Sequence, residues 1–136
     1  MKIRVYYEDT DCGGVVYHSN YLKYMERGRT ELLRDAGIDL AQYHNTGIVF
    51  AITEANLQFR ASAKYDDLLT LKTTLTEVTS YRLTFHAEIF NQQGTLCCRG
   101  DVKMVGVYTK TGTVARIPEQ ALIAVETLFQ KENHVS

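Results

Sequence analysis

The order of hydrophobic periods along the chain limits the fold more than any other feature of the sequence. One long helical pattern, residues 19–36, stands between a short strand pattern at residues 3–8 and four long strand patterns. The long strand patterns occupy residues 48–60, 69–76, 82–89 and 95–108, and a second helical pattern follows at residues 118–131. A sheet of about five antiparallel strands therefore has only one long helix to cover it. The economical solution is an α+β fold in which a curved sheet wraps around that helix.

Local signals refine this outline. Ser19 or Asn20 can cap the start of the first helix, and Gly37 stands where a left-handed residue commonly ends one. Gly28 lies in mid-helix, where glycine costs about 1 kcal/mol relative to alanine, so we expect a close crossing of helix and sheet there. Within residues 48–60 the apolar positions change parity, which predicts a bulge or a sharp bend. Residues 91–94 predict a hairpin turn.

Composition and charge bound the class of protein. With 136 residues, of which 45% are hydrophobic, the chain fits a single domain over residues 1–136 with an ordinary core. Fifteen basic and sixteen acidic residues give a net charge of −1, which argues against a chain-wide nucleic-acid surface. No apolar run is long enough for a membrane span, and the early strand pattern leaves no room for a signal peptide. We therefore expect a cytoplasmic protein.

The three cysteines do not suggest a disulfide framework. Cys12, Cys97 and Cys98 make an odd count, and adjacent strand residues are expected to point to opposite faces. The sequence also has no Cys-x-x-Cys pair and no cysteine–histidine spacing typical of zinc sites. These features favour reduced thiols.

The segment that carries the most chemical information is residues 7–21. Asp11 lies on a glycine-containing loop, and a predicted helix begins shortly after His18. Free amides at a helix start can stabilise a developing oxyanion, and a carboxylate is ionised at neutral pH and can act as base or nucleophile. No Gly-x-Ser-x-Gly motif indicates a serine route. Taken alone, an aspartate near glycines is also typical of a plain turn.

The string RVYYEDTDCGGVVYHSNY at residues 4–21 resembles the signature of hotdog-fold acyl-CoA thioesterases. More narrowly, it is similar to the branch related to 4-hydroxybenzoyl-CoA thioesterase whose members accompany the Tol–Pal cell-envelope system. The similarity continues at residues 24–31 and 63–69, and the element order covers nearly the whole chain. The resemblance implies a hotdog fold and hydrolysis of an acyl-CoA to CoA and a free acid. It implies sites between the subunits of a homodimer, often within a homotetramer, and no metal or cofactor beyond the CoA of the substrate.

The same resemblance assigns roles to individual residues. Asp11 matches the catalytic carboxylate, and His18 matches the motif histidine whose backbone amide would polarise the thioester carbonyl. Tyr7 matches a tyrosine that packs beside the site. Two positions depart from the family, which often has proline at Ser62 and alanine or serine at Cys12. The candidate substrate-binding residues are Val16 and Tyr17, the cations Arg60 and Lys64, and, where relatives meet the CoA phosphates, Tyr81 and Arg82.

Other interpretations stay open at this point. Glu26 on the helix could be the working carboxylate, Cys12 could be a nucleophile, and Asp9, Asp11 and His18 could bind a metal. A solvated turn is an equal alternative for Tyr81, Arg82, Arg60 and Lys64. An enzymatic alternative is a hydratase or dehydratase acting on acyl thioesters. A further alternative is a module that binds acyl carrier protein or a partner of the cell envelope.

Overall fold

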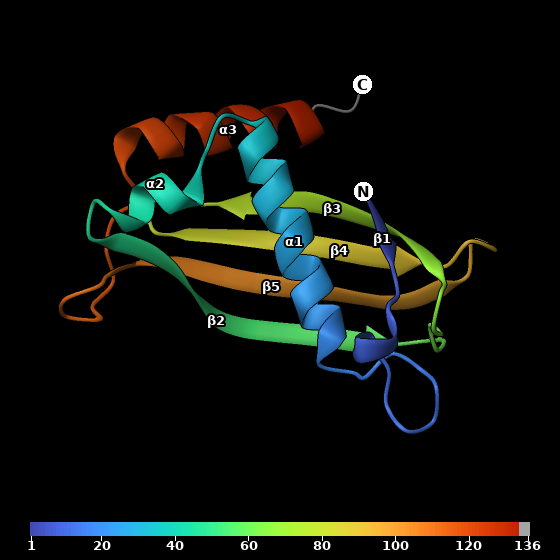
Figure 1. The fold of residues 1–136 in the computed structure, drawn as a ribbon. Coiled ribbons are helices and arrows are strands. Elements are labelled where there is room, and N and C mark those ends of the chain that lie inside the picture. The colour runs from blue at the N-terminus through green and yellow to red at the C-terminus, as the bar shows by residue number, and fades with distance from the viewer. Residues whose placement is uncertain (134–136) are drawn as a thin grey trace.

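Five antiparallel strands form one curved sheet in the order β1-β3-β4-β5-β2, and helix α1 crosses its inner face (Figure 1). The computed structural model of the chain describes residues 1–133. This arrangement confirms the α+β hotdog fold, a curved sheet around one long helix, that the sequence predicts. The elements are β1 (Lys2–Arg4), the 3-10 turn η1 (Tyr7–Asp9), α1 (Asn20–Asp35), α2 (Leu40–His44), β2 (Ile48–Phe59), β3 (Leu68–Val78), β4 (Arg82–Phe90), β5 (Leu96–Tyr108) and α3 (Glu119–Asn133).

Helix α1 buries one stripe of side chains against the sheet. Tyr24, Met25 and Leu33 are almost completely buried, and a buried side chain of this size contributes about 1.5–3 kcal/mol. Gly28 lies in the middle of the stripe: a Cβ there would stand 2.4 Å from Thr73 Oγ1 on β3. The close crossing predicted at Gly28 is therefore confirmed.

The predicted bulge is present in β2. The pairing register of β2 with β5 shifts between Ile52 and Glu54. The alternation of inward-facing and outward-facing residues along β2 is therefore shifted by one residue at this point. A second shift, where Ile89 pairs with Cys98 and Phe90 with Leu96, leaves Cys97 as an extra residue of β5.

That second bulge makes the expectation for the cysteines wrong. Cys97 and Cys98 do not divide between the two faces of the sheet, because both lie in the same buried cluster. Burial raises the pKa of Cys97 and raises the pKa of Cys98 to about 12, so both thiols stay protonated at neutral pH. Cys12 is exposed, and all three cysteines are free.

The first strand is shorter than predicted. It ends at Arg4, and Tyr7–Asp9 form η1 instead of continuing the strand to residue 8. The Asp9 carboxylate accepts a hydrogen bond from the Tyr6 N–H at 2.9 Å, and this local bond turns the chain. The turn directs the following loop toward the start of α1.

The helix ends were predicted in part. Gly37, which follows the C-cap residue Ala36, has φ +88° as predicted. Neither Ser19 nor Asn20 caps the helix start through its side chain. Helix α2 was not predicted; Asp39 caps it by accepting a hydrogen bond from the Ala41 N–H at 3.0 Å. None of the helices in residues 1–133 has the length and apolar character needed to cross a membrane.

Helix α3 covers the part of the β3 edge that β1 leaves free. Among residues 1–133, strand β1 pairs with Leu68–Thr70 alone. Further along, the Glu132 carboxylate accepts a hydrogen bond from the Leu75 N–H at 2.8 Å, and Asn133 Nδ2 donates to the Leu75 carbonyl at 3.3 Å. These side chains form hydrogen bonds with backbone groups of β3 that would otherwise stay unpaired at an open strand edge.

Replacing Glu132 by glutamine is expected to stabilise the protein at neutral pH, raising Tm by about 2–4 °C. Burial raises the pKa of Glu132, so the folded state holds a proton more tightly than the unfolded state does. The stabilising contribution of that proton is present below the unfolded pKa and is lost as pH rises through the folded pKa. Glutamine keeps an oxygen acceptor for Leu75 without the charge.

The measurement is thermal unfolding of both proteins between pH 3.5 and pH 8, with Glu126→Gln on the exposed face of α3 as the matched control. The gain from Glu132→Gln should shrink toward acid pH, and Glu126→Gln should show no such trend. A Tm difference that is constant over the pH range would contradict the assignment.

Candidate active site

Asp11 lies in a tight hairpin whose arms are joined by the pairing of Thr10 with Val16. The Asp11 N–H donates to the Val15 carbonyl at 2.9 Å, and Gly14, with φ +79°, supplies the left-handed turn residue. Asp11 Oδ1 accepts a hydrogen bond from the Gly13 N–H at 2.7 Å. Within residues 1–133 its Oδ2 accepts none, so one oxygen is anchored and the other is available. The side chain is exposed at the mouth of the loop.

The Asp9 carbonyl ties this hairpin to the start of α1. It accepts a hydrogen bond from the Tyr17 N–H at 2.9 Å and another from Asn20 Nδ2 at 2.8 Å. Asn20 is buried at the first position of α1. Burial raises the pKa of the nearby Tyr24 hydroxyl, and the Asp9 carboxylate adds to that rise. The Asp11 loop and the helix start are therefore held in a fixed relation to each other.

His18 precedes α1 by two residues. Among the described residues, no acceptor takes a hydrogen bond from the backbone N–H of His18 or of Ser19. Unsatisfied amides at a helix start carry partial positive charge. The His18 ring packs beside the Tyr17 ring, with 4.3 Å between the ring centroids. The helix start thus offers hydrogen-bond donors close to the loop that carries Asp11.

A pocket of about 320 Å³ opens beside His18, between the start of α1 and the end of β2. The Phe59 ring forms one wall, 6.4 Å from the His18 ring and 5.6 Å from the Tyr21 ring, measured between centroids. Arg60 adds a cation to the lining, and its Nη2 donates to Gln58 Oε1 at 2.9 Å. The sequence interpretation missed Tyr21 and Phe59 as site residues. After the bulge, Phe59 has the same parity as Leu57, which predicts that both side chains face inward. This pattern was the signal that could have identified Phe59.

Most of the predicted site residues gather at this end of the molecule. Val16 and Arg60 line the pocket. Tyr7 is 78% exposed, and its ring meets the Tyr65 ring edge-on at 5.9 Å. Lys64 is exposed and pairs with Val15 of the hairpin.

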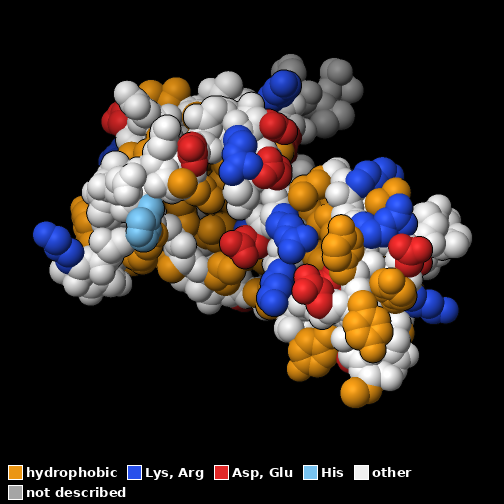
Figure 2. All heavy atoms as spheres, viewed as in Figure 1, with side chains coloured by type: hydrophobic (Ala, Val, Ile, Leu, Met, Phe, Trp, Pro, Cys, Tyr) orange, Lys and Arg blue, Asp and Glu red, His pale blue; other side chains and the backbone are white. Residues whose placement is uncertain are grey.

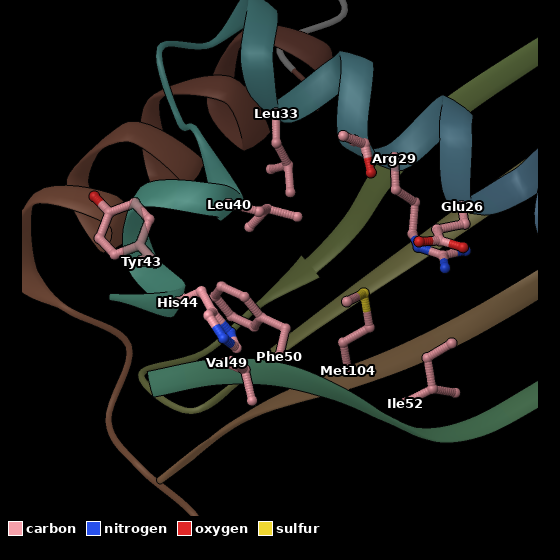
Figure 3. A pocket seen from close by; sticks show the side chains of 11 residues that line it. Glu26, Arg29, Leu33, Leu40, Tyr43, His44, Val49, Phe50, Ile52 and Met104 are labelled. Carbon is pink, nitrogen blue, oxygen red and sulfur yellow. The ribbon is translucent and has the colours of Figure 1, made fainter. Parts of the chain in front are cut away.

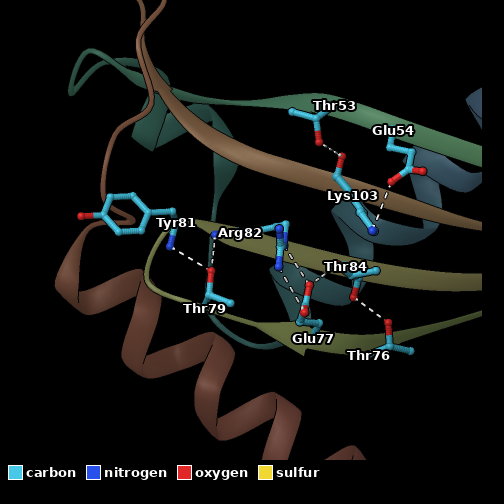
Figure 4. A network of polar contacts seen from close by, with 9 residues as sticks. All are labelled: Thr53, Glu54, Thr76, Glu77, Thr79, Tyr81, Arg82, Thr84 and Lys103. Atoms are coloured by element: carbon cyan, nitrogen blue, oxygen red, sulfur yellow. Dashed lines mark hydrogen bonds and ion pairs between the residues drawn. The ribbon is translucent and has the colours of Figure 1, made fainter.

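Tyr81 and Arg82 lie at the opposite end of the sheet, and within one chain they do not join the site. They follow the end of β3, whose 11 residues span about 33 Å from the end that adjoins the Asp11 loop. Figure 4 shows the Arg82 guanidinium bound to the Glu77 carboxylate, with distances of 2.9 and 3.3 Å. Bonds from Arg82 and Thr84 lower the pKa of Glu77. In a single chain, Arg82 therefore belongs to a network on the outer face of the sheet.

The structure also places the alternative catalytic residues. Glu26 follows His18 by eight residues, about 12 Å along α1, and lines a different hollow. Cys12 is exposed in the hairpin next to Asp11. Within residues 1–133 no three His, Cys, Asp or Glu side chains are grouped for a metal ion, and Asp9, Asp11 and His18 are no exception.

The chain resembles known proteins in both sequence and fold. Residues 5–125 match the model of the thioesterase-like superfamily. The acyl-CoA thioester hydrolase YbgC of Escherichia coli is 37% identical over 105 residues, which cover 77% of this chain and 78% of that protein. The acyl-CoA thioesterase YbgC of Helicobacter pylori is 34% identical over 132 residues, 96% of each chain. The DHNA-CoA thioesterase of Staphylococcus aureus superposes with a TM-score of 0.89 at 26% identity, over 99% of this chain and 95% of that one. The chain therefore belongs to the thioesterase-like superfamily and has its hotdog fold.

Proposed function

We propose that this chain is an acyl-CoA thioesterase that hydrolyses an acyl-CoA to CoA and a free carboxylic acid. The observation that carries the proposal is the connection made by the Asp9 carbonyl. It holds the Asp11 hairpin against the start of α1, where the His18 amide has no acceptor among the described residues. A carboxylate and an oxyanion donor are thereby supplied by adjoining segments. The relatives named as acyl-CoA thioesterases in Escherichia coli and Helicobacter pylori support the same reaction.

In the proposed mechanism the thioester carbonyl oxygen accepts a hydrogen bond from the His18 N–H. Asp11 either attacks the carbonyl carbon through Oδ2 or takes a proton from a water molecule that attacks it. Both routes form a tetrahedral oxyanion that the helix-start amide stabilises. The carbon–sulfur bond then breaks, and CoA leaves as a thiolate that takes up a proton. In the nucleophilic route, water afterwards hydrolyses the acyl–Asp11 anhydride and frees the acid.

The remaining residues are proposed to bind the substrate. The pocket walled by Tyr21 and Phe59 takes the thioester end, and Arg60 is placed to attract an anionic part of CoA. No metal or further cofactor takes part in the proposed steps. Homo-oligomer formation, as a dimer or tetramer, is part of the proposal, because Tyr81 and Arg82 can reach CoA phosphates only at the site of another subunit.

The proposal is tested by release of free thiol from a panel of acyl-CoA substrates: short aliphatic, long aliphatic and aromatic. Hydrolysis of at least one substrate, with equal amounts of thiol and acid, is the expected result. The same panel on acyl carrier protein identifies the preferred donor. Absence of thiol release from every substrate would overturn the proposal.

Two other outcomes would favour the alternatives. Loss of water from a β-hydroxyacyl-CoA without thiol release would indicate a hydratase or dehydratase. Capture of acyl carrier protein that survives Asp11→Asn, together with undetectable turnover by the wild type, would indicate a binding module.

A further inference from the structure

The Tyr24 hydroxyl is a buried polar group that the proposed mechanism does not use. Tyr24 is 1% exposed, and its hydroxyl makes no hydrogen bond to any group within residues 1–133. The ring itself is held in place: the Tyr21 ring meets it edge-on at 6.3 Å between centroids, and the Arg27 guanidinium lies over it at 5.8 Å. A buried hydroxyl without a partner is unfavourable, and native proteins rarely keep one. An acceptor for this hydroxyl is therefore expected close by.

The Asp9 carboxylate is placed to be that acceptor. Asn20 lies one helical turn before Tyr24 on the same buried stripe of α1, and its Nδ2 donates to the Asp9 carbonyl at 2.8 Å. Asp9 Oδ2 accepts a hydrogen bond from the Tyr6 N–H at 2.9 Å, whereas in the described chain its Oδ1 accepts none. Burial raises the pKa of Tyr24, and the neighbouring Asp9 carboxylate raises it further, which keeps the proton on the hydroxyl. The free oxygen and the free hydroxyl each supply what the other lacks.

The other carboxylate in this part of α1 is turned away from Tyr24. Glu26 follows Tyr24 by two residues, and side chains at that spacing do not face each other on a helix. Figure 3 shows Glu26 beside Arg29 at the hollow between α1 and β2. Asp9 is therefore the carboxylate that the Tyr24 hydroxyl can bind.

The hairpin that carries Asp11 buries little apolar surface of its own. Residues 11–14 are exposed, and between residues 11 and 18 the structure buries Val16 alone. In Figure 2 hydrophobic side chains are exposed at the end of the molecule where the hairpin lies, and Tyr7 and Tyr17 are both exposed. Because few apolar contacts hold the hairpin, its position relative to α1 depends on polar contacts.

We propose that Tyr24 is a positioning residue, whose hydroxyl donates to Asp9 Oδ1 and thereby holds the Asp11 hairpin against α1. Asn20 binds the backbone of Asp9 and Tyr24 binds its side chain, so two contacts one helical turn apart prevent Asp9 from rotating. Asp11 follows two residues later, so this anchor sets its place relative to the His18 amide. Tyr24 is too deeply buried to touch a substrate and acts through Asp9. The inference rests on the proposed function, because it concerns the positioning of Asp11.

The test is a double-mutant cycle with Tyr24→Phe and Asp9→Asn. Phenylalanine fills the same space without the hydroxyl, and asparagine keeps an oxygen for the Tyr6 N–H while it removes the carboxylate. Tyr24→Phe is expected to lower kcat by about fivefold or more with KM nearly unchanged, because a misplaced Asp11 slows the chemical step. In the Asp9→Asn background the same change should lower kcat by less than about twofold, since Tyr24 acts through Asp9.

The matched control is Tyr108→Phe, which removes an exposed hydroxyl at the end of β5 and should keep the wild-type kcat. Thermal unfolding of all variants shows whether each is folded under the assay conditions.

Amide hydrogen exchange gives a readout that does not depend on turnover. The Tyr17 N–H donates to the Asp9 carbonyl at 2.9 Å, so its exchange reports how firmly the hairpin is held to α1. Tyr24→Phe is expected to speed this exchange by about tenfold. The Ile38 N–H, which donates to the Leu33 carbonyl at the far end of α1, should exchange as in the wild type. A general loss of stability would instead speed the exchange of both amides.

These readouts separate the positioning role from the proposed function. If the wild type releases no thiol, the proposed function fails, and unchanged Tyr17 exchange in Tyr24→Phe would overturn the anchor as well. If the wild type is active, a wild-type kcat in Tyr24→Phe would overturn the positioning role. Equal losses of kcat from Tyr24→Phe in both backgrounds would do the same, because Tyr24 would then act without Asp9. A raised Tm with unchanged Tyr17 exchange would indicate a hydroxyl that has no partner, which also contradicts the proposal.

Discussion

Asp11→Asn is expected to lower kcat for acyl-CoA hydrolysis by about two decades or more while KM changes little. An amide is neither a base nor a nucleophile toward a thioester, so the step assigned to Oδ2 is lost. The asparagine Oδ1 can still accept the hydrogen bond from the Gly13 N–H, which is 2.7 Å long in the structure. The loop should therefore keep its shape, and the loss should appear in the chemical step. Steady-state thiol release and the Tm of both proteins are the measurements.

The matched control is Asp66→Asn, which makes the same chemical change in an exposed neighbouring loop. Asp66 has φ +71°, a conformation that asparagine also tolerates, so this variant should keep the wild-type kcat. Equal rates for Asp11→Asn and the wild type would remove Asp11 from the mechanism. If Glu26→Gln were then the slow variant, the catalytic carboxylate would be Glu26.

The elements that the sequence predicts well are those that a local pattern specifies. The period of 3.6 residues locates α1, and the period of two locates β2 to β5, because each pattern records which side chains face the core. The change of parity within residues 48–60 records the bulge at Ile52 and Glu54 in the same way. Gly28 is informative because a glycine in mid-helix is unfavourable unless a neighbour approaches closely.

The features that the sequence does not predict depend on partners far along the chain. Cys97 and Cys98 share one face because β4 pairs with β5 through a bulge, which adjacent cysteines do not signal. The Asn20 side chain does not cap the helix but donates through Nδ2 to the Asp9 carbonyl, a backbone group without a sequence signature. Helix α2 has five residues, too few for a helical period to stand out.

The candidate site likewise contains residues that the sequence predicts and residues that it does not predict. Asp11 and His18 stand in one contiguous string, so a motif locates both of them. Phe59 comes from the far end of β2 and reaches His18 only through the fold. Tyr81 and Arg82 resemble family positions that contact substrate, yet in a single chain they lie across the sheet from Asp11. A single sequence does not tell which chain of an assembly supplies a residue.

Gly28→Val is expected to destabilise the fold by about 3 kcal/mol and to lower Tm by about 10 °C or more. A Cβ at this position would stand 2.4 Å from Thr73 Oγ1 and 2.6 Å from Leu71 Cδ2, well inside van der Waals contact. The branched side chain of valine adds two methyl groups and restricts χ1 within the helix. Helix α1 would have to rise from β3, weakening the packing of its whole buried stripe. Urea unfolding and thermal unfolding measure the loss.

Two variants separate this clash from the helical preference of valine itself. Lys23→Val places valine on the exposed face of α1 and should cost less than about 1 kcal/mol, because only propensity changes there. Gly28→Ala should fall between the two, since alanine gains about 1 kcal/mol of helix propensity while its Cβ still meets Thr73 and Leu71. If Gly28→Val were as stable as Lys23→Val, the helix and β3 could not be in close contact at Gly28. Because α1 begins two residues after His18, a displacement of the helix by valine should also lower the activity of the protein. Gly28→Ala should retain more activity than Gly28→Val.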